Sequence, residues 1–139
     1  MPRNYITEFG CPFEIWREEG LVRLVLSQGA TIQVSEMKEL LRLLDALDPG
    51  RTTPVLLEQD ELAGISHEAG TFVLRACKGP GRCVAFMAHG LADRLQGNFF
   101  LRFQRPRFLF RVFGERAEAM RWLRERHQLM TLGVAVDRG

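Results

Sequence analysis

The spacing of apolar and polar residues changes along the chain, and its first pattern predicts a β-hairpin. Phe13 and Ile15 alternate with polar residues, Glu19-Gly20 supplies a turn, and residues 21–26 form a mostly apolar run. Alternation followed by a short glycine-containing turn and a β-rich run is typical of two antiparallel strands. The regular structure is therefore expected to begin with a hairpin.

The next patterns are helical. Between Ser35 and Leu47 apolar residues recur every three or four positions, which predicts an amphipathic helix with Ser35 as its N-cap. A second helix is expected to start at Ser66, again as N-cap, and to stop before segment 78–81, where glycine and proline cannot continue it.

Two more helices are expected in the second half of the chain. Residues 90–103 have helical spacing, although Gly97-Asn98 could end one helix and begin another, and this choice stays open. A last helix is expected to begin at residues 114–115.

Short apolar runs between the helices predict further strands. Residues 53–58 and 83–88 have the composition of strands covered on both faces, and residues 107–113 alternate as at a sheet edge. Because a strand-helix-strand crossover returns the chain in the same direction, these later strands are expected to be parallel. The predicted fold class is α/β, a single-domain mixed sheet of about five strands with about four helices.

One domain accounts for nearly the whole chain. We expect a lead-in segment at 1–12, the α/β domain at 13–128 and a C-terminal tail at 129–139. At 139 residues, one core is enough to stabilise the fold. The tail could be an extra strand, a surface segment or a segment exchanged with a partner, and the pattern does not choose among them.

Composition and charge narrow the class of protein. The formal net charge of +2 is too small to imply nucleic acid or an anionic membrane by itself, so local patches have to be judged separately. Cys11, Cys77 and Cys83 have no metal or disulfide spacing and are expected to be buried or half-buried thiols in a reducing compartment. No apolar run is long enough for a membrane span, and the N-terminus lacks a secretory signal, so the expected location is cytoplasmic.

Histidines are the first candidates for chemistry. His67 and His89 follow adjacent predicted strands, at the edge where α/β folds usually place ligands. With Glu58 or Asp60 nearby they would form a metal or general-base site, which is an alternative rather than the preferred interpretation. The sequence contains no phosphate-binding glycine loop or nucleophile motif, and we expect neither a cofactor nor catalysis.

The segment from Arg94 to Gly114 is unusual because five arginines and six phenylalanines alternate there without an acidic residue. The preferred interpretation is that the phenylalanines fill the core while the arginines are solvated or pair with the acidic loop at 58–61. A protein interface is the second interpretation. Single-stranded nucleic acid, which binds through phosphate contacts and base stacking, is the third, and nucleic acid is not an expected partner.

Two stretches resemble a known family. Residues 54–70, PVLLEQDELAGISHEAG, resemble the central part of STAS domains, in which an apolar strand leads through an acidic loop to a helix that begins at a phosphorylatable serine. The motifs GNFFLR (97–102), PRF (106–108), RVF (111–113) and EAMRWL (118–123) resemble a bacterial SpoIIAA-like group of uncharacterised STAS-type proteins. The order of elements agrees over nearly the whole chain.

The resemblance implies a regulatory module that docks a protein partner, such as a serine kinase or an anti-sigma-like factor, and a homodimer stays open as well. Here the family's usual aspartate position is Ser66 and its phosphoserine position is His67, followed by Glu68. The phosphorylation switch is therefore absent or displaced to Ser66. Ser66, His67, Glu68 and Asp60 are the expected partner-binding or switch residues.

A second function comes from SEC14-like relatives of this fold, which enclose an apolar ligand or lipid between helices and sheet. The alternatives predict different structures. A docking module should expose a flat apolar patch near the second helix, whereas a lipid binder should contain a closed apolar pocket of several hundred cubic ångströms. An enzyme should bring His67, His89 and a carboxylate together.

Overall fold

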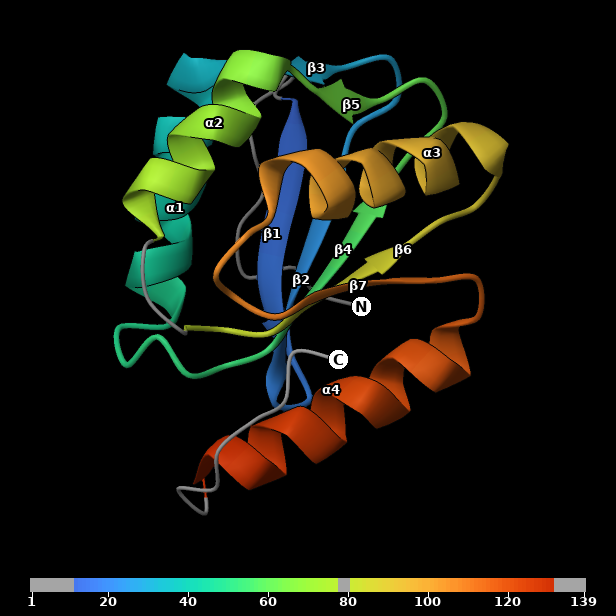
Figure 1. Ribbon diagram of the computed structural model, residues 1–139. Coiled ribbons are helices and arrows are strands. Elements are labelled where there is room, and N and C mark those ends of the chain that lie inside the picture. Colours follow the sequence, from blue (N-terminus) through green and yellow to red (C-terminus); the bar gives the residue numbers. More distant parts are fainter. Residues whose placement is uncertain (1–11, 78–80, 132–139) are drawn as a thin grey trace.

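The structure, a computed structural model, describes residues 12–77 and 81–131, which fold around a five-stranded sheet (Figure 1). The strand order is β1-β2-β4-β6-β7. These strands are β1 (Phe13–Glu18), β2 (Leu21–Leu26), β4 (Val55–Gln59), β6 (Val84–Met87) and β7 (Phe110–Phe113). Each of the last four lies within three residues of its predicted position, and β7 is at the sheet edge as expected.

The opening hairpin has a two-residue loop. Glu18 pairs with Leu21, which leaves Glu19 and Gly20 between the strands, with φ of 48° and 82°. Two positive φ values are typical of the turn whose twist matches an antiparallel hairpin, and glycine adopts the second without strain. β2–β4, β4–β6 and β6–β7 all pair parallel, so the predicted mixed sheet is confirmed.

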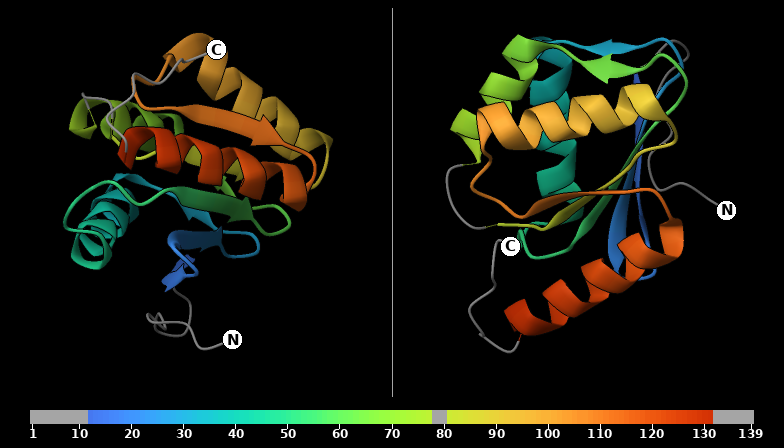
Figure 2. Two further views of the ribbon diagram at one scale, coloured as in Figure 1. Left: turned by 90° about the horizontal axis from the view of Figure 1, so that it is seen from below. Right: turned by 45° about the vertical axis from the view of Figure 1, so that its right-hand side comes forward.

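Helices cover both faces of the sheet. Three lie on one face and one on the other (Figures 1 and 2). The first group is α1 (Val34–Leu47), α2 (His67–Ala76) and α3 (Leu91–Phe99), which continues into the π-helical turn η1 (Phe100–Gln104). The other face is covered by α4 (Arg116–Thr131).

A small second sheet was not predicted. β3 (Thr31–Ile32) and β5 (Gly64–Ile65) pair parallel and form a sheet separate from the main one. Strands of two residues are too short to show a period in the sequence. The pair places Ile65 and Ser66 immediately before α2, because the Ser66 amide donates to the Ile32 carbonyl at 2.9 Å.

The predicted N-cap of α1 is wrong by two residues. The helix begins at Val34 with Gln33 as N-cap, and the Gln33 amide donates to the Glu36 carboxylate at 2.9 Å. The Ser35 hydroxyl donates to the same carboxylate at 2.7 Å, and these hydrogen bonds lower the pKa of Glu36. Ser35 thus supports the cap through Glu36, because a carboxylate in the third helical position can reach back to the N-cap amide.

Alternate side chains of the central strand β4 pack in two separate apolar clusters, one on each face of the sheet. Val55 and Leu57 pack with α1 and α2, while Leu56 packs with α4. This arrangement confirms that the run at 53–58 is covered on both faces. The α4 cluster includes Trp122 and Leu123, from the predicted last helix.

Gly97 allows α3 to lie close to the sheet. An added Cβ at this position would be 2.6 Å from Val112 and 2.7 Å from Phe86, so any larger residue would push the helix outward. The helix does not break at Gly97-Asn98 but continues to Phe99. It ends after η1, where Arg105 has a φ of 47° and donates its amide to the Phe100 carbonyl.

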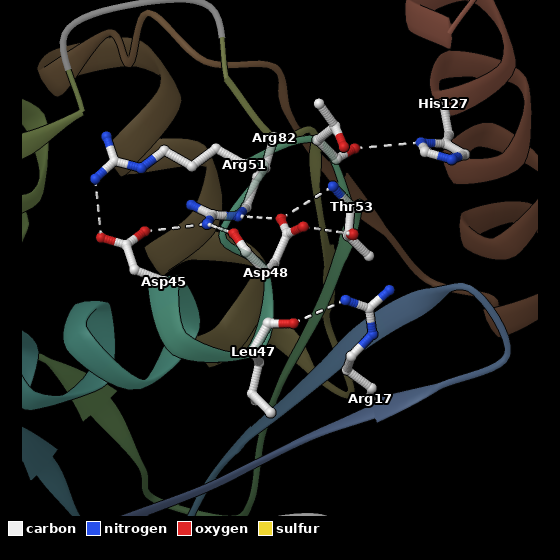
Figure 3. Close-up of polar contacts among 9 residues, drawn as sticks. Arg17, Asp45, Leu47, Asp48, Arg51, Thr53, Arg82 and His127 are labelled. Carbon is white, nitrogen blue, oxygen red and sulfur yellow. Dashed lines mark hydrogen bonds and ion pairs between the residues drawn. The ribbon is translucent and has the colours of Figure 1, made fainter.

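A polar network joins the end of α1 to the segments that precede β4 and β6 (Figure 3). Buried Asp48 accepts hydrogen bonds from the Thr53 amide at 3.0 Å, the Thr53 hydroxyl at 2.8 Å and Arg82 Nε at 2.8 Å. Arg82 also pairs with Asp45, at 3.1 Å. Burial alone would raise the pKa of Asp48, but the hydrogen bonds from Thr53 and Arg82 outweigh it and hold the pKa below its ordinary value.

The ends of the chain are described only in part. α4 includes residues 129–131 of the predicted tail, whereas 132–139, the lead-in residues 1–11 and Cys11 lie outside the described residues. Cys77 is half-buried and Cys83 is buried, as expected, and burial raises the pKa of the Cys83 thiol to about 11. None of the helices described here combines the length and apolar character needed to cross a membrane.

Candidate functional site

The predicted switch residues lie at the N-terminus of α2. Ser66 is the N-cap, as expected, and its hydroxyl accepts a hydrogen bond from the Ala69 amide at 3.1 Å. Ser66 is half-buried, whereas His67 and Glu68 are exposed in the first turn. This helix start therefore presents an imidazole and a carboxylate to solvent beside a hydroxyl that already stabilises the helix.

Asp60 occupies a different place, in the turn that follows β4. It is exposed, its amide donates to the Leu26 carbonyl at 2.8 Å, and its carbonyl accepts from the Ala63 amide at 3.0 Å. The backbone bonds of Asp60 thus close the turn between β4 and β5. Its neighbour Leu62 has a φ of 64° and a fully exposed side chain.

The two histidines have different partners. His89 Nε2 lies 3.1 Å from the Glu58 carboxylate, whereas His67 Nδ1 lies 3.5 Å from the side-chain amide of Gln104. The structure thus joins His89 to Glu58 but places His67 against η1. Within residues 12–77 and 81–131, no group of three His, Cys, Asp or Glu side chains is placed to hold a metal ion.

Glu58 is the centre of an ion-pair cluster that the sequence did not predict. Its carboxylate is buried at the carboxyl end of β4 and accepts from Arg23 at 2.5 Å and from Arg116 at 3.0 and 3.1 Å. Arg23 also pairs with Glu18 at 2.7 Å. A signal was present, because a glutamate inside a buried strand and an arginine inside the neighbouring strand both require a charged partner.

A cavity of about 1030 Å³, partly open to solvent, lies on the α1–α2–α3 side of the sheet. It is lined by residues of α1, α2, α3 and η1 and by the sheet, from β2 across to β7. Most of the lining is apolar. Representative lining side chains are Leu24, Leu57 and Phe86 from the sheet, Met37 and Leu41 from α1, Val73 from α2, Leu95 and Phe99 from α3, and Phe100 from η1.

Polar groups lie at two places along this cavity. Asp45, Arg51 and Arg82, from the network of Figure 3, lie along the part of the wall formed by the end of α1 and by the loops that precede β4 and β6. Ser66 and His67 belong to the part formed by the start of α2. Two of the four predicted switch residues therefore line the apolar pocket, whereas Glu68 and Asp60 do not.

A buried amide lies at the α3 side of the cavity. Gln59, at the end of β4, donates from Nε2 to Asp93 at 3.0 Å and lies 3.2 Å from both the Gln96 side chain and the Ala63 carbonyl. Gln59 and Gln96 both line the cavity. The amide pair joins α3 to the sheet and supplies hydrogen-bonding atoms to an otherwise apolar wall.

The arginine- and phenylalanine-rich segment divides into two parts. Phe100, Phe108 and Phe110 form a ring cluster, with centroids 4.9 to 6.4 Å apart, and Phe113 packs on Trp122 at 5.5 Å. Phe113 is a core residue and Phe110 packs against the core, as the preferred interpretation expects, whereas Phe100 and Phe108 are half-buried. Phe99 and Phe103 are instead exposed. Glu58 does not pair with an arginine of this segment, because Arg23 and Arg116 both lie outside it.

Comparison with solved structures identifies the fold. A crystal structure of an uncharacterised protein of the DUF3478 family with a SpoIIAA-like fold, from Shewanella loihica PV-4, superposes with a TM-score of 0.52. It is 19% identical in sequence, and the superposition covers 80% of this chain and 91% of that one. The chain accordingly has a SpoIIAA-like fold, as its sequence motifs indicated.

Sequence comparisons give the family. No curated protein matches the chain significantly. A family of domains of unknown function matches over residues 15–127, from the first strand of the hairpin to the last turns of α4. The chain is therefore a member of the family described as "Domain of unknown function (DUF7793)".

Proposed function

We propose that this chain is a non-catalytic, cytoplasmic binding module for an apolar small molecule or lipid. The observation that supports this function is the cavity between the helices and the sheet. Its volume of about 1030 Å³ is just above the range typical of small-molecule sites, about 300–1,000 Å³. Its size and apolar lining agree with the lipid-binding alternative, although the cavity is partly open where that alternative predicts a closed one.

The lining supports an apolar ligand with a small polar group. Leucine and phenylalanine side chains provide contact area, and burial of apolar ligand surface contributes about 25 cal/mol per Å². Ser66, Gln96 and Gln104 provide hydroxyl and amide groups along one side. A few polar atoms in an apolar pocket orient a ligand while the apolar walls supply most of the affinity.

Filling part of the cavity from within should weaken binding. Val73 lines the cavity from α2, so Val73→Trp places an indole in the space that a ligand would occupy. With N-phenyl-1-naphthylamine as the probe, we expect saturable binding to the natural protein and an affinity at least tenfold lower in this variant. The measurement is a titration followed by the probe's own fluorescence.

Arg75→Trp is the matched control. Arg75 is exposed on the same helix and does not line the cavity, so the same indole there should leave probe affinity unchanged. Circular dichroism on both variants establishes that they are folded. Equal affinities for Val73→Trp and Arg75→Trp would contradict binding in the cavity.

A second candidate function is protein docking at the start of α2. Leu62 and Ile65 are exposed apolar residues next to this helix start, where His67 and Glu68 are exposed as well. Such a surface suits a protein partner, for which the resemblance suggests a kinase or an anti-sigma-like factor. A phosphate on Ser66 would gain from the helix amides yet add about two negative charges to the contact.

Charge reversal tests this candidate. If a partner docks at the start of α2, Glu68→Lys should weaken the complex about tenfold, measured with the partner recovered by affinity purification. Glu125→Lys, an exposed reversal on α4, is the control and should have no effect. Mass spectrometry of the protein treated with a kinase encoded near it would show phosphate on Ser66. Equal binding by both variants would place the interface elsewhere.

A further inference from the structure

The outer surface of α3 and η1 carries an apolar stripe of four residues. Leu91, Leu95, Phe99 and Phe103 follow one another at intervals of four, and their side chains are 73%, 61%, 52% and 65% exposed. Residues four apart lie one above the other on a helix. Single exposed apolar side chains are ordinary, but an unbroken row over three turns marks an interaction surface.

The core does not require this stripe. α3 contacts the sheet through Gly97, which lies on the opposite side of the helix from Leu95 and Phe99. The Phe99 and Phe103 rings contact each other at 4.8 Å between centroids. The helix thus has one face for the sheet and a second apolar face directed outward.

The charge beside the stripe is positive at its η1 end. Arg102, Arg105 and Arg107 are exposed there, and the Arg102 guanidinium lies 5.9 Å from the centre of the Phe103 ring. Two acidic residues, Asp93 and Asp60, lie toward the other end of α3. Asp93 is half-buried and accepts from Gln59 and from the His89 amide, and exposed Asp60 follows Gln59.

The stripe also forms a rim of the cavity. Leu95 and Phe99 are exposed on α3 and at the same time line the cavity. A surface that covered the stripe would therefore meet the apolar cavity at its edge. An apolar molecule could then pass from that surface into the cavity without crossing water.

We infer that the α3–η1 stripe docks the protein on the surface of an anionic lipid membrane. Apolar side chains on a helix beside arginines are the features of helices that lie in the membrane interface. The stripe is three helical turns long, about 16 Å, and only one side chain wide. Its area is therefore much smaller than the roughly 800 Å² per partner of a stable protein interface. Docking on a membrane has no such requirement. Uptake of a ligand from the membrane rests on the proposed function, whereas docking itself does not.

Vesicle sedimentation without any added ligand tests the docking. Vesicles of phosphatidylcholine mixed equally with phosphatidylserine should bind the protein, and vesicles of phosphatidylcholine alone should bind it at least tenfold less. Binding should fall as salt rises, because the screening length shrinks from about 10 Å at 0.1 M to about 3 Å at 1 M. Failure to bind the mixed vesicles at low salt would overturn the inference.

Three substitutions locate the contact. Phe103→Ser removes an exposed ring that does not line the cavity, and Arg102→Glu reverses an exposed charge beside it. Each should lower partition onto mixed vesicles at least tenfold, while Arg124→Glu, an exposed reversal on α4, should retain most of the binding. Equal losses in Arg102→Glu and Arg124→Glu would overturn the assignment to this helix.

The outcomes separate docking from ligand binding and from self-association. Probe affinity should be unchanged in Phe103→Ser. Loss of vesicle binding together with normal probe binding would therefore support membrane docking independently of ligand binding in the cavity. Sedimentation velocity without vesicles tests the competing occupant. A dimer that dissociates in Phe103→Ser, together with no vesicle binding by the natural protein, would assign the stripe to a second copy of the chain instead.

Discussion

Replacement of Asp48 by asparagine should lower the free energy of unfolding by about 3 kcal/mol, because removal of one partner from a buried ion pair leaves the other charge uncompensated. The group left behind is Arg82, whose guanidinium also donates to the Asp48 carbonyl at 2.9 Å. Asparagine keeps the shape and still accepts one hydrogen bond from Thr53, but it has no charge. Urea denaturation at neutral pH measures the loss.

The effect should depend on pH in a defined direction. The pKa of Asp48 is lower in the folded protein than in the unfolded chain, where it is about 3.9. The unfolded state therefore binds more protons as the pH falls, so the stability from this carboxylate is fully present above the unfolded pKa and is lost as the pH falls through the folded pKa. The difference between the natural protein and Asp48→Asn should be constant from about pH 6 to 8 and shrink below about pH 4.

Asp45→Asn is the control in the same network. Asp45 pairs with Arg51 and Arg82, but its side chain is partly exposed, so its ion pairs should contribute at most about 1 kcal/mol. Equal losses for Asp45→Asn and Asp48→Asn would show that burial of Asp48 does not govern the effect. A pH-independent difference down to pH 3 would contradict the lowered pKa.

Replacement of Glu58 by glutamine should be the second large effect, again about 3 kcal/mol of unfolding free energy. The Glu58 side chain is 8% exposed, and its carboxylate pairs with two arginines and contacts His89. Glutamine cannot neutralise Arg23, which is itself mostly buried, although Glu18 still pairs with it. Denaturant midpoints of the single variant measure the loss.

A double-mutant cycle assigns this loss to the pair. Arg23→Met removes the buried charge while keeping much of the side-chain volume, so Glu58→Gln should cost clearly less in that background. His89→Gln removes the half-exposed partner and should cost less than about 1 kcal/mol. Additive effects of Arg23→Met and Glu58→Gln would contradict direct coupling between the two residues.

Sequence patterns predicted the main elements because each has enough residues to show a period. The hairpin, the three later strands and the helices beginning at or near Ser35, Ser66 and residue 114 all follow from such patterns. The exceptions are local. β3 and β5 have two residues each, and the cap of α1 depends on the Glu36 side chain, which bonds the backbone three residues earlier.

The sequence predicted some residues of the candidate site but not the contacts between them. Ser66 as N-cap was confirmed, and His67 and Glu68 are exposed beside it. The approach of His67 to His89, which only the enzyme alternative required, was not seen, because His89 bonds Glu58 and His67 contacts Gln104. Partners of this kind are 31 to 37 residues apart in the chain, and no local pattern records such a separation.

The sequence by itself determined the class of fold, since the alternation of periods specifies which segments become strands and helices. Only the tertiary structure decided which apolar side chains stay outside the core. Leu95 and Phe99 have the same helical spacing as core residues, yet they lie at the rim of a cavity of about 1030 Å³ and on an exposed stripe. The reason is physical: spacing places residues on one face of a helix, but only the packing of α3 through Gly97 determines which face meets the sheet.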